Sequence, residues 1–343
     1  MESDGVFAPS IEDHNMHNQR PRRLRRDGIR QLVSETSLTT HDLVAPLFVD
    51  ASADERIPIP SMPGHDRVPL DSIVERAREV ESTGISSVML FGIPASKDEE
   101  GSRAWADNGI IQKALRILSN ETNLYLITDV CLCEYTDHGH CGVLEPDART
   151  SSRSLTVAND ATLKRLARTA VSHVDAGADM VAPSSMTDGM VGAIRAGLDS
   201  AGYQTVPILS YAVKYESSFY GPFRDAADGA PAFGDRRHYQ MDPANGREAV
   251  REARLDVEEG ADIVMVKPAT AYLDVIKTVS ETVDVPVAAY NVSGEYAMIV
   301  AAEKQGWLDQ QATAIESLLA MKRAGASIIV TYFAEEVGQQ LPA

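Results

Sequence analysis

One unit recurs along the chain and restricts the folds available to it. A helix-like stretch ends at a glycine, and a short apolar run follows at once, in units that begin at Ser82, Asp175, Glu258 and Arg323. Glycine at such a junction supplies the positive φ that a helix C-cap requires. The apolar runs do not alternate with polar residues, which is typical of parallel strands buried on both faces.

Eight strands are predicted, with amphipathic stretches such as 161–176 and 247–259 between them. They cover residues 45–49, 87–91, 124–130, 179–184, 207–212, 262–267, 286–291 and 327–332. Alternation of strand and helix predicts an α/β fold, and eight repeats in 343 residues favour a (β/α)8 TIM barrel. A doubly wound open sheet is the alternative.

Two segments fall outside this rhythm. Residues 1–40 are predicted as an N-terminal arm, polar up to Gln19 and then strongly basic in RPRRLRR from Arg20. This arm is either a solvated tail or a segment that docks on an acidic neighbouring subunit. Within the predicted catalytic barrel, 41–343, the segment 221–245 is rich in Gly, Pro and Asp without periodicity, which favours a lid loop.

The formal net charge of −18 argues against nucleic acid as a partner. This acidity indicates either adaptation to high salt or ordinary solubility. No apolar run approaches the ~20 residues of a membrane span, and no secretory signal is visible. We therefore expect a cytoplasmic protein.

Two lysines end predicted strands, although only 8 of the 32 basic residues are lysines. Lys214 follows the fifth strand and Lys267 closes the sixth, at the edge where barrels carry their catalytic groups. An amine can attack a carbonyl, whereas a guanidinium cannot. Either lysine alone is explained by solvation or by an ion pair, such as Lys214 with Glu216. Two at adjacent strand ends favour Schiff-base chemistry, because neighbouring cations favour the neutral amine.

All three cysteines lie in one segment, spaced Cys-x-Cys-x7-Cys at Cys131, Cys133 and Cys141. Three thiolates on one strand–loop unit can hold a zinc ion and leave its fourth position open, as in catalytic zinc sites. Three thiols that only pack together are the alternative. His138 and His140 are further candidates as ligands or as residues that support the ligands.

Other polar side chains fall at strand ends or in the predicted lid. Arg224, Arg236 and Arg237 lie in the lid, where arginines either clamp a substrate carboxylate or form ordinary surface charge. The strand-end set comprises Asp129, Ser184, Tyr290, Ser293 and Tyr332. Hydroxyls of Ser293 and Tyr332 could bind a second carboxylate or simply be polar groups at strand ends.

The segments SYAVKYESSFYGPFRDAA, IVMVKPA, YNVSGEY and DVCLCEYTDHGHCG together resemble the porphobilinogen synthase (5-aminolevulinate dehydratase) family, over a stretch from Arg20 to Tyr332. The resemblance implies a lyase that joins two 5-aminolevulinate molecules into porphobilinogen with loss of two waters, in tetrapyrrole and heme biosynthesis. The cysteine motif resembles that of the family's zinc-dependent branch.

The resemblance also implies roles for the site residues. Lys267 matches the Schiff-base lysine of the propionate-side substrate, Lys214 that of the acetate-side substrate, and Asp129 an active-site carboxylate. The remaining matches are the zinc ligands Cys131, Cys133 and Cys141, the acetate-side residues Arg224 and Arg236, and the propionate-side residues Ser293 and Tyr332, with Tyr290 beside them.

Glu252 resembles the glutamate that supports an allosteric magnesium ion in many bacterial-type members, and the basic arm resembles the segment that wraps a neighbour in the family's homo-octamer. An ordinary solvated or helix-face carboxylate is the alternative for Glu252. The chain departs from the family where it reads APSSMTDGM instead of APSDMMDGR, so that Ser185, Thr187 and Met190 replace an acid, a methionine and an arginine. Any role of that acid or that arginine is therefore in doubt.

Two rival readings account for less of the chain. An aldolase-type barrel explains one Schiff-base lysine but neither the second lysine nor the cysteines. A non-enzymatic zinc-binding module explains the cysteines but not the lysines.

Overall fold

The computed structural model describes residues 20–146 and 155–341, which fall into two compact units divided after Ser37. The first unit holds the short helices η1 (Pro21–Arg25) and α2 (Ile29–Leu32), neither of which buries a residue. The predicted arm boundary at residue 40 lies close to this division, and residues 1–19 of the predicted arm lie outside the described part.

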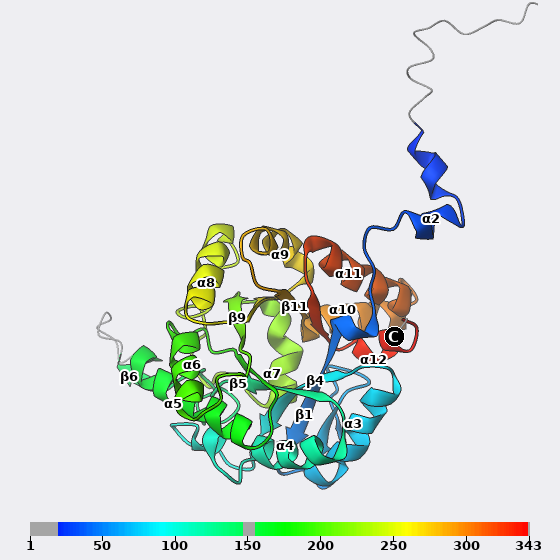
Figure 1. The fold of residues 1–343 in the computed structure, drawn as a ribbon. Helices are drawn as coiled ribbons and strands as arrows, with labels where there is room; N and C mark the ends of the chain where they lie inside the picture. Colours follow the sequence, from blue (N-terminus) through cyan, green and yellow to red (C-terminus); the bar gives the residue numbers. More distant parts are fainter. Residues whose placement is uncertain (1–19, 147–154, 342–343) are drawn as a thin grey trace, which may run out of the picture. The chain divides into compact units, whose positions relative to one another are not determined.

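The second unit is a barrel of eight parallel strands, with the longer helices around the outside (Figure 1). The strands are β1 (Leu43–Asp50), β4 (Ser87–Ile93), β5 (Tyr125–Val130), β8 (Met180–Pro183), β9 (Leu209–Lys214), β10 (Ile263–Lys267), β11 (Val287–Asn291) and β12 (Ile328–Thr331). β1 pairs with β12, and a bridge between Val181 and Ile208 joins β8 to β9. The predicted TIM barrel is therefore confirmed, and the open doubly wound sheet is wrong.

Two helices contain the stretches predicted as amphipathic, and each buries one face: α5 (Asn159–Asp175) and α8 (Gly246–Glu258). The other helices are α3 (Ile73–Ser82), α4 (Ile110–Glu121), α6 (Met190–Ser200), α9 (Leu273–Ser280), α10 (Ser293–Lys304), α11 (Gln310–Ala324) and α12 (Ala334–Gly338), of which α12 follows the last strand. Gly177 and Gly325 follow α5 and α11 with φ of 110° and 117°. Only glycine adopts this conformation without strain, so these glycines end the helices and send the chain into the next strand.

The second unit also contains shorter elements. They are η2 (Thr40–Asp42), β2 (Ile57–Pro58), β3 (Asp66–Pro69), η3 (Leu70–Ser72), η4 (Ser102–Trp105), β6 (Leu144–Pro146), β7 (Leu155–Val157), η5 (Ser218–Tyr220) and η6 (Thr270–Tyr272). Every residue of β1, β9, β10 and β11 is buried, which explains the unbroken apolar runs. In the part of the chain that the structure describes, no helix combines the length and apolarity of a membrane span.

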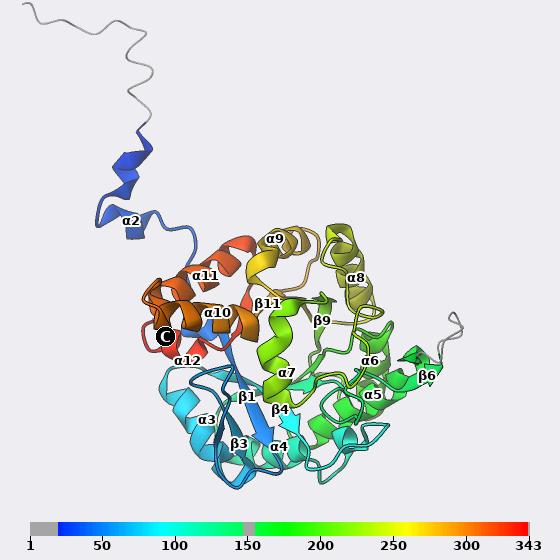
Figure 2. The same ribbon diagram turned by 180° about the vertical axis from the view of Figure 1, so that it is seen from behind.

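The predicted lid segment 221–245 differs from the expected loop at its start, where residues Gly221–Ala227 form the helix α7. Pro222 in the first turn presets a helical φ, and the buried Ala226 and Ala227 anchor the end of the helix. Two turns are too short to show a helical period, which is why the sequence pattern missed them. Figure 2 shows α7 in front of the ring of strands.

Candidate active site

The two lysines lie side by side at the carboxyl ends of neighbouring strands. Lys214 and Lys267 are paired in register across β9 and β10, and each side chain is buried. The Lys214 Nζ donates a hydrogen bond to the Ser184 carbonyl oxygen, 2.5 Å away at the end of β8. Continuous parallel pairing therefore brings three of the predicted strand-end residues together.

Aromatic rings surround the amine of Lys267. Its Nζ lies 4.1 Å from the ring centroid of Tyr290, 5.0 Å from those of Tyr211 and Phe223, and 5.4 Å from that of Tyr220. Burial, and then the nearby charge of Lys214, lower the pKa of Lys267 from 10.5 to about 7. A large fraction of this amine is therefore neutral near pH 7, as a nucleophile requires.

Asp129 lies one residue before the end of β5, at the same mouth, and is also buried. Burial, and then the negative charge of Glu134, raise the pKa of Asp129 from 3.8 to about 7, while Lys214 and a hydrogen bond with Ser184 oppose the rise. A carboxyl with this pKa can both accept and donate a proton near neutral pH.

The three cysteines form a compact cluster of free thiols. Their sulfur atoms all lie within 4.8 Å of one another, and the Cys131 Sγ donates to the Cys133 Sγ at 3.3 Å. Hydrogen bonds from Cys131 and Cys133 lower the pKa of Cys141, so the cluster favours at least one thiolate. Convergent soft sulfur donors on one loop are suited to a metal ion.

The two candidate histidines lie beside the cysteines without joining their sulfur atoms. The His138 Nε2 is 3.2 Å from the Glu99 carbonyl oxygen, and its Nδ1 accepts from the His140 backbone N–H. The His140 ring nitrogens lie near the Tyr239 hydroxyl and the Phe233 carbonyl. Both rings therefore brace the loop, which fits the supporting role rather than that of a ligand.

The three arginines of the predicted lid segment fall into two classes. Arg236 is buried and donates through Nη2 to the carbonyl oxygens of Gly139 and Gly229, and Arg224 is half-buried. The Nε atoms of both are buried without a hydrogen-bond partner. Arg237 instead exposes 74% of its side chain near Glu216 and Asp235, so its surface-charge alternative holds.

The Ser293 hydroxyl contacts α7, and the two strand-end tyrosines contact each other, and the sequence indicated neither contact. The Ser293 Oγ accepts from the Phe223 backbone N–H at 2.9 Å, so it holds the first turn of α7. The hydroxyls of Tyr290 and Tyr332 lie 3.2 Å apart. Tyr290 borders Lys267, whereas neither Ser293 nor Tyr332 is among the residues that line the small cavity beside the lysines.

That cavity has a volume of about 20 Å³, close to the space that one water molecule needs. Its lining comprises Phe91, Asp129, Cys133, Glu134, Ser184, Lys214, Tyr220, Phe223, Arg224, Arg236 and Lys267. Glu134, Phe91, Tyr220 and Phe223 were not singled out from the sequence. For Glu134 a signal existed, because it adjoins Cys133, but a residue beside a ligand has no distinctive spacing of its own.

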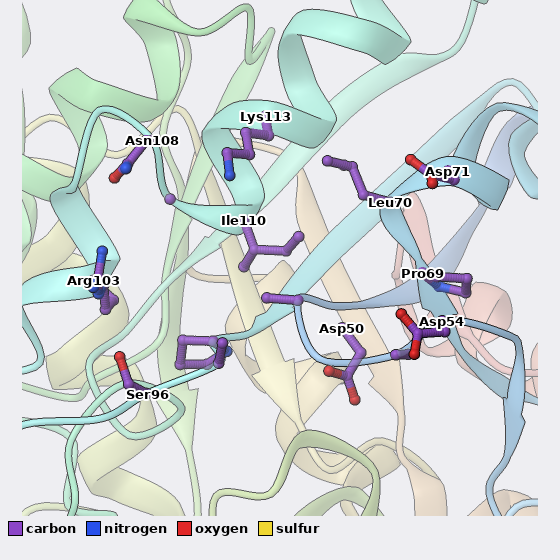
Figure 3. A pocket seen from close by; sticks show the side chains of 15 residues that line it. Asp50, Asp54, Pro69, Leu70, Asp71, Ser96, Arg103, Asn108, Ile110 and Lys113 are labelled. Carbon is purple, nitrogen blue, oxygen red and sulfur yellow. The ribbon is translucent and has the colours of Figure 1, made fainter.

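A larger pocket of about 410 Å³ lies at the ends of β1 and β4, and Figure 3 shows Asp50, Asp54, Arg103 and Lys113 around it. Asp54, Arg103 and Lys113 are exposed, and none of the predicted site residues reaches this pocket. Size alone therefore does not identify the active site, since the buried lysines lie elsewhere.

Glu252 lies on α8, away from the lysines, in a hollow of about 460 Å³ that Asp188, Glu248 and Glu259 also line. Burial, and then the charge of Asp188, raise the pKa of Glu252. Among the described residues the only group of three or more close candidate metal ligands is the cysteine cluster, so Glu252 lacks a preformed cage.

The three departures from the family motif meet in one buried contact. The Ser185 Oγ lies 2.7 Å from the Thr187 Oγ1 and 3.6 Å from the Met190 Sδ. The positions where the family has an acid and an arginine are therefore neighbours in this chain.

Comparison with known proteins places the chain in a family. The sequence model of the delta-aminolevulinic acid dehydratase family matches residues 18–340 of this chain. The enzyme of that name from Halalkalibacterium halodurans is 54% identical over 325 residues, with 94% of this chain and 97% of the relative covered. The one from Archaeoglobus fulgidus is 52% identical over 323 residues, with 94% and 98% covered.

A solved structure agrees with these relatives. The porphobilinogen synthase of Toxoplasma gondii, crystallised in complex with the reaction product porphobilinogen, superposes with a TM-score of 0.89 at 41% identity, and the match covers 94% of this chain and 91% of that one. The resemblance found in the sequence motifs is thereby confirmed. This chain belongs to the delta-aminolevulinic acid dehydratase family.

Proposed function

We infer that this chain is a hydro-lyase that condenses two 5-aminolevulinate molecules into porphobilinogen with loss of two waters, a step of heme biosynthesis. The observation that carries this function is the pair of buried lysines in register at the barrel mouth, within a chain that matches the family over nearly its whole length. Neither an aldolase-type barrel nor a zinc-binding module uses both lysines.

The lysines are proposed to hold the two substrates. The neutral amine of Lys267 attacks the ketone of the propionate-side molecule, a C=N bond forms, and the carbonyl oxygen leaves as water. Lys214 is assigned the acetate-side molecule. Asp129, with its pKa near 7, is placed to move protons between the two. Most of the rate enhancement comes from holding two identical molecules in different orientations.

The cysteine cluster is proposed as a zinc site, as in the zinc-dependent branch of the family. Cys131, Cys133 and Cys141 would hold the ion, and the ion would supply Lewis-acid chemistry beside the lysines. Three convergent free sulfur atoms support this assignment.

The remaining polar residues are proposed to bind substrate carboxylates. Arg224 and Arg236 would take the acetate-side carboxylate, because each brings a buried, unpartnered Nε to the cavity wall. Ser293 and Tyr332, with Tyr290 alongside, would take the propionate-side carboxylate once α7 moves and releases the Ser293 hydroxyl.

Assembly and location are further parts of the proposal. The exposed basic arm is assigned to docking on a neighbouring subunit in a homo-octamer, and Glu252 to a hydrated magnesium ion that regulates this assembly, since magnesium needs few protein ligands. A cytoplasmic location stays a prediction.

Incubation with 5-aminolevulinate followed by an aldehyde reagent for pyrroles tests the reaction. The native chain should develop colour, and Lys267→Arg should not, because it keeps the charge but loses the nucleophile. Borohydride added with the substrate should leave a covalent adduct on Lys267. An inactive native protein with zinc supplied, or an adduct found only on other lysines, would contradict the assignment.

A further inference from the structure

Glu134 is a buried carboxylate in the active-site cavity that the reaction as described above does not use. Its side chain is 3% exposed, and its Oε2 is buried without a hydrogen-bond partner. A buried polar atom left unpaired costs roughly 1–3 kcal/mol, so its retention calls for a partner that arrives from outside the chain.

Glu134 lies beside the residues that are proposed to react with the substrate. It lines the cavity together with both lysines, Asp129 and the two lid arginines. Its negative charge is close enough to influence Asp129 and Lys267. Among the described residues, the three-sulfur group does not include an oxygen of Glu134, so the cysteines can hold a metal without it.

The residues assigned so far bind the ketone and carboxylate groups of the substrate but leave its ammonium group without a partner. Each 5-aminolevulinate carries a carboxylate and an ammonium group. The cavity wall offers Arg224 and Arg236 for carboxylates, but an ammonium group in the cavity meets the like charge of Lys214. Asp129 is already engaged by Ser184 and Lys214. Glu134 is the remaining acidic side chain on the described wall.

We propose that Glu134 binds the ammonium group of one of the two 5-aminolevulinate molecules through Oε2, and so selects a keto acid that carries an amine. The proposal rests on the function inferred above and adds a specificity residue to it. A charge-assisted hydrogen bond of this kind is directional, so it also fixes the nitrogen end of the substrate relative to the lysine that holds its ketone.

The test compares 5-aminolevulinate with 4-oxopentanoate, which keeps the ketone and the carboxylate but lacks the amine. Glu134→Gln removes the charge and leaves the shape. We expect kcat/KM for 5-aminolevulinate to fall about 10- to 100-fold, the loss of one hydrogen bond to a charged group. The inhibition constant of 4-oxopentanoate, and its borohydride trapping on lysine, should stay as in the native chain. Glu134→Asp, which keeps the charge, should recover part of the loss.

Asp137→Asn is the matched control, because Asp137 is an exposed acid on the same loop and outside the cavity. It should leave both ligands unaffected. Equal weakening of 5-aminolevulinate and 4-oxopentanoate by Glu134→Gln would overturn the proposal, as would no change for either. A native chain that binds both ligands but forms no pyrrole would instead contradict the proposed function, while the difference between the ligands still tests Glu134.

Discussion

The lowered pKa of Lys267 leads to a quantitative prediction about Schiff-base formation. A shift from 10.5 to about 7 corresponds to about 5 kcal/mol of preference for the neutral amine, at 1.36 kcal/mol per unit. With a pKa near 7, roughly nine-tenths of the amine is neutral at pH 8 and roughly one-tenth at pH 6. Nucleophilic attack should therefore slow about tenfold over this interval as pH falls, and level off above pH 8.

Borohydride trapping of 4-oxopentanoate on Lys267 measures this step directly, with adduct located by peptide mass. Lys214→Met tests the second cause of the shift: without the neighbouring cation, the midpoint of the trapping curve should move to higher pH, while burial keeps it below 10.5. A trapping rate that still rises tenfold per pH unit between 8 and 10 would refute the argument, since it would mean an ordinary lysine.

Three other outcomes are expected. Chelation should abolish pyrrole formation, and zinc should restore it in the native chain but not in Cys131→Ala, because two sulfur atoms cannot complete the site; a fully active chain without bound metal contradicts this. Ser185→Asp or Met190→Arg alone should lower the free energy of unfolding by about 3–5 kcal/mol, because each buries an unpaired charge. The double variant should regain part of this loss, because the acid and the arginine can pair. Urea unfolding of the native chain, the two single variants and the double variant measures this, and strictly additive losses would argue against an interaction between the two positions. If the charge of −18 reflects adaptation to salt, the melting temperature should rise with potassium chloride, whereas a flat series indicates ordinary solubility.

The barrel was predictable because the sequence features that indicate it are local. An unbroken apolar run and a glycine at the end of the preceding helix lie within about ten residues of each other, and both features occur in the structure, as at Gly325 before β12. The helix α7 was not predictable in this way. Its stability comes from contacts of Phe223 and Ala226 with distant parts of the chain, not from a periodic pattern of its own.

The site was predictable only in part, for the same reason. The lysines could be placed because strand ends of a parallel barrel converge. Arg236 and Arg237 are neighbours with the same chemistry, yet one is buried against Gly139 and the other exposed. Their difference is set by a segment far away in sequence, and no local pattern encodes it. Glu134 was missed because burial without a partner is a property of packing.

The small volume of the cavity links substrate binding to the position of α7. Two 5-aminolevulinate molecules do not fit into about 20 Å³, so we expect substrate binding to move α7 away from the barrel mouth. The Ser293 hydroxyl now holds α7 through the Phe223 backbone, while Arg224 on α7 keeps an unpartnered Nε. A substrate carboxylate that bound Ser293 would break the first contact, and one that bound Arg224 would make a new one. Opening and reclosing would then each be driven by a substrate carboxylate, which couples closure of the lid to occupation of both substrate positions.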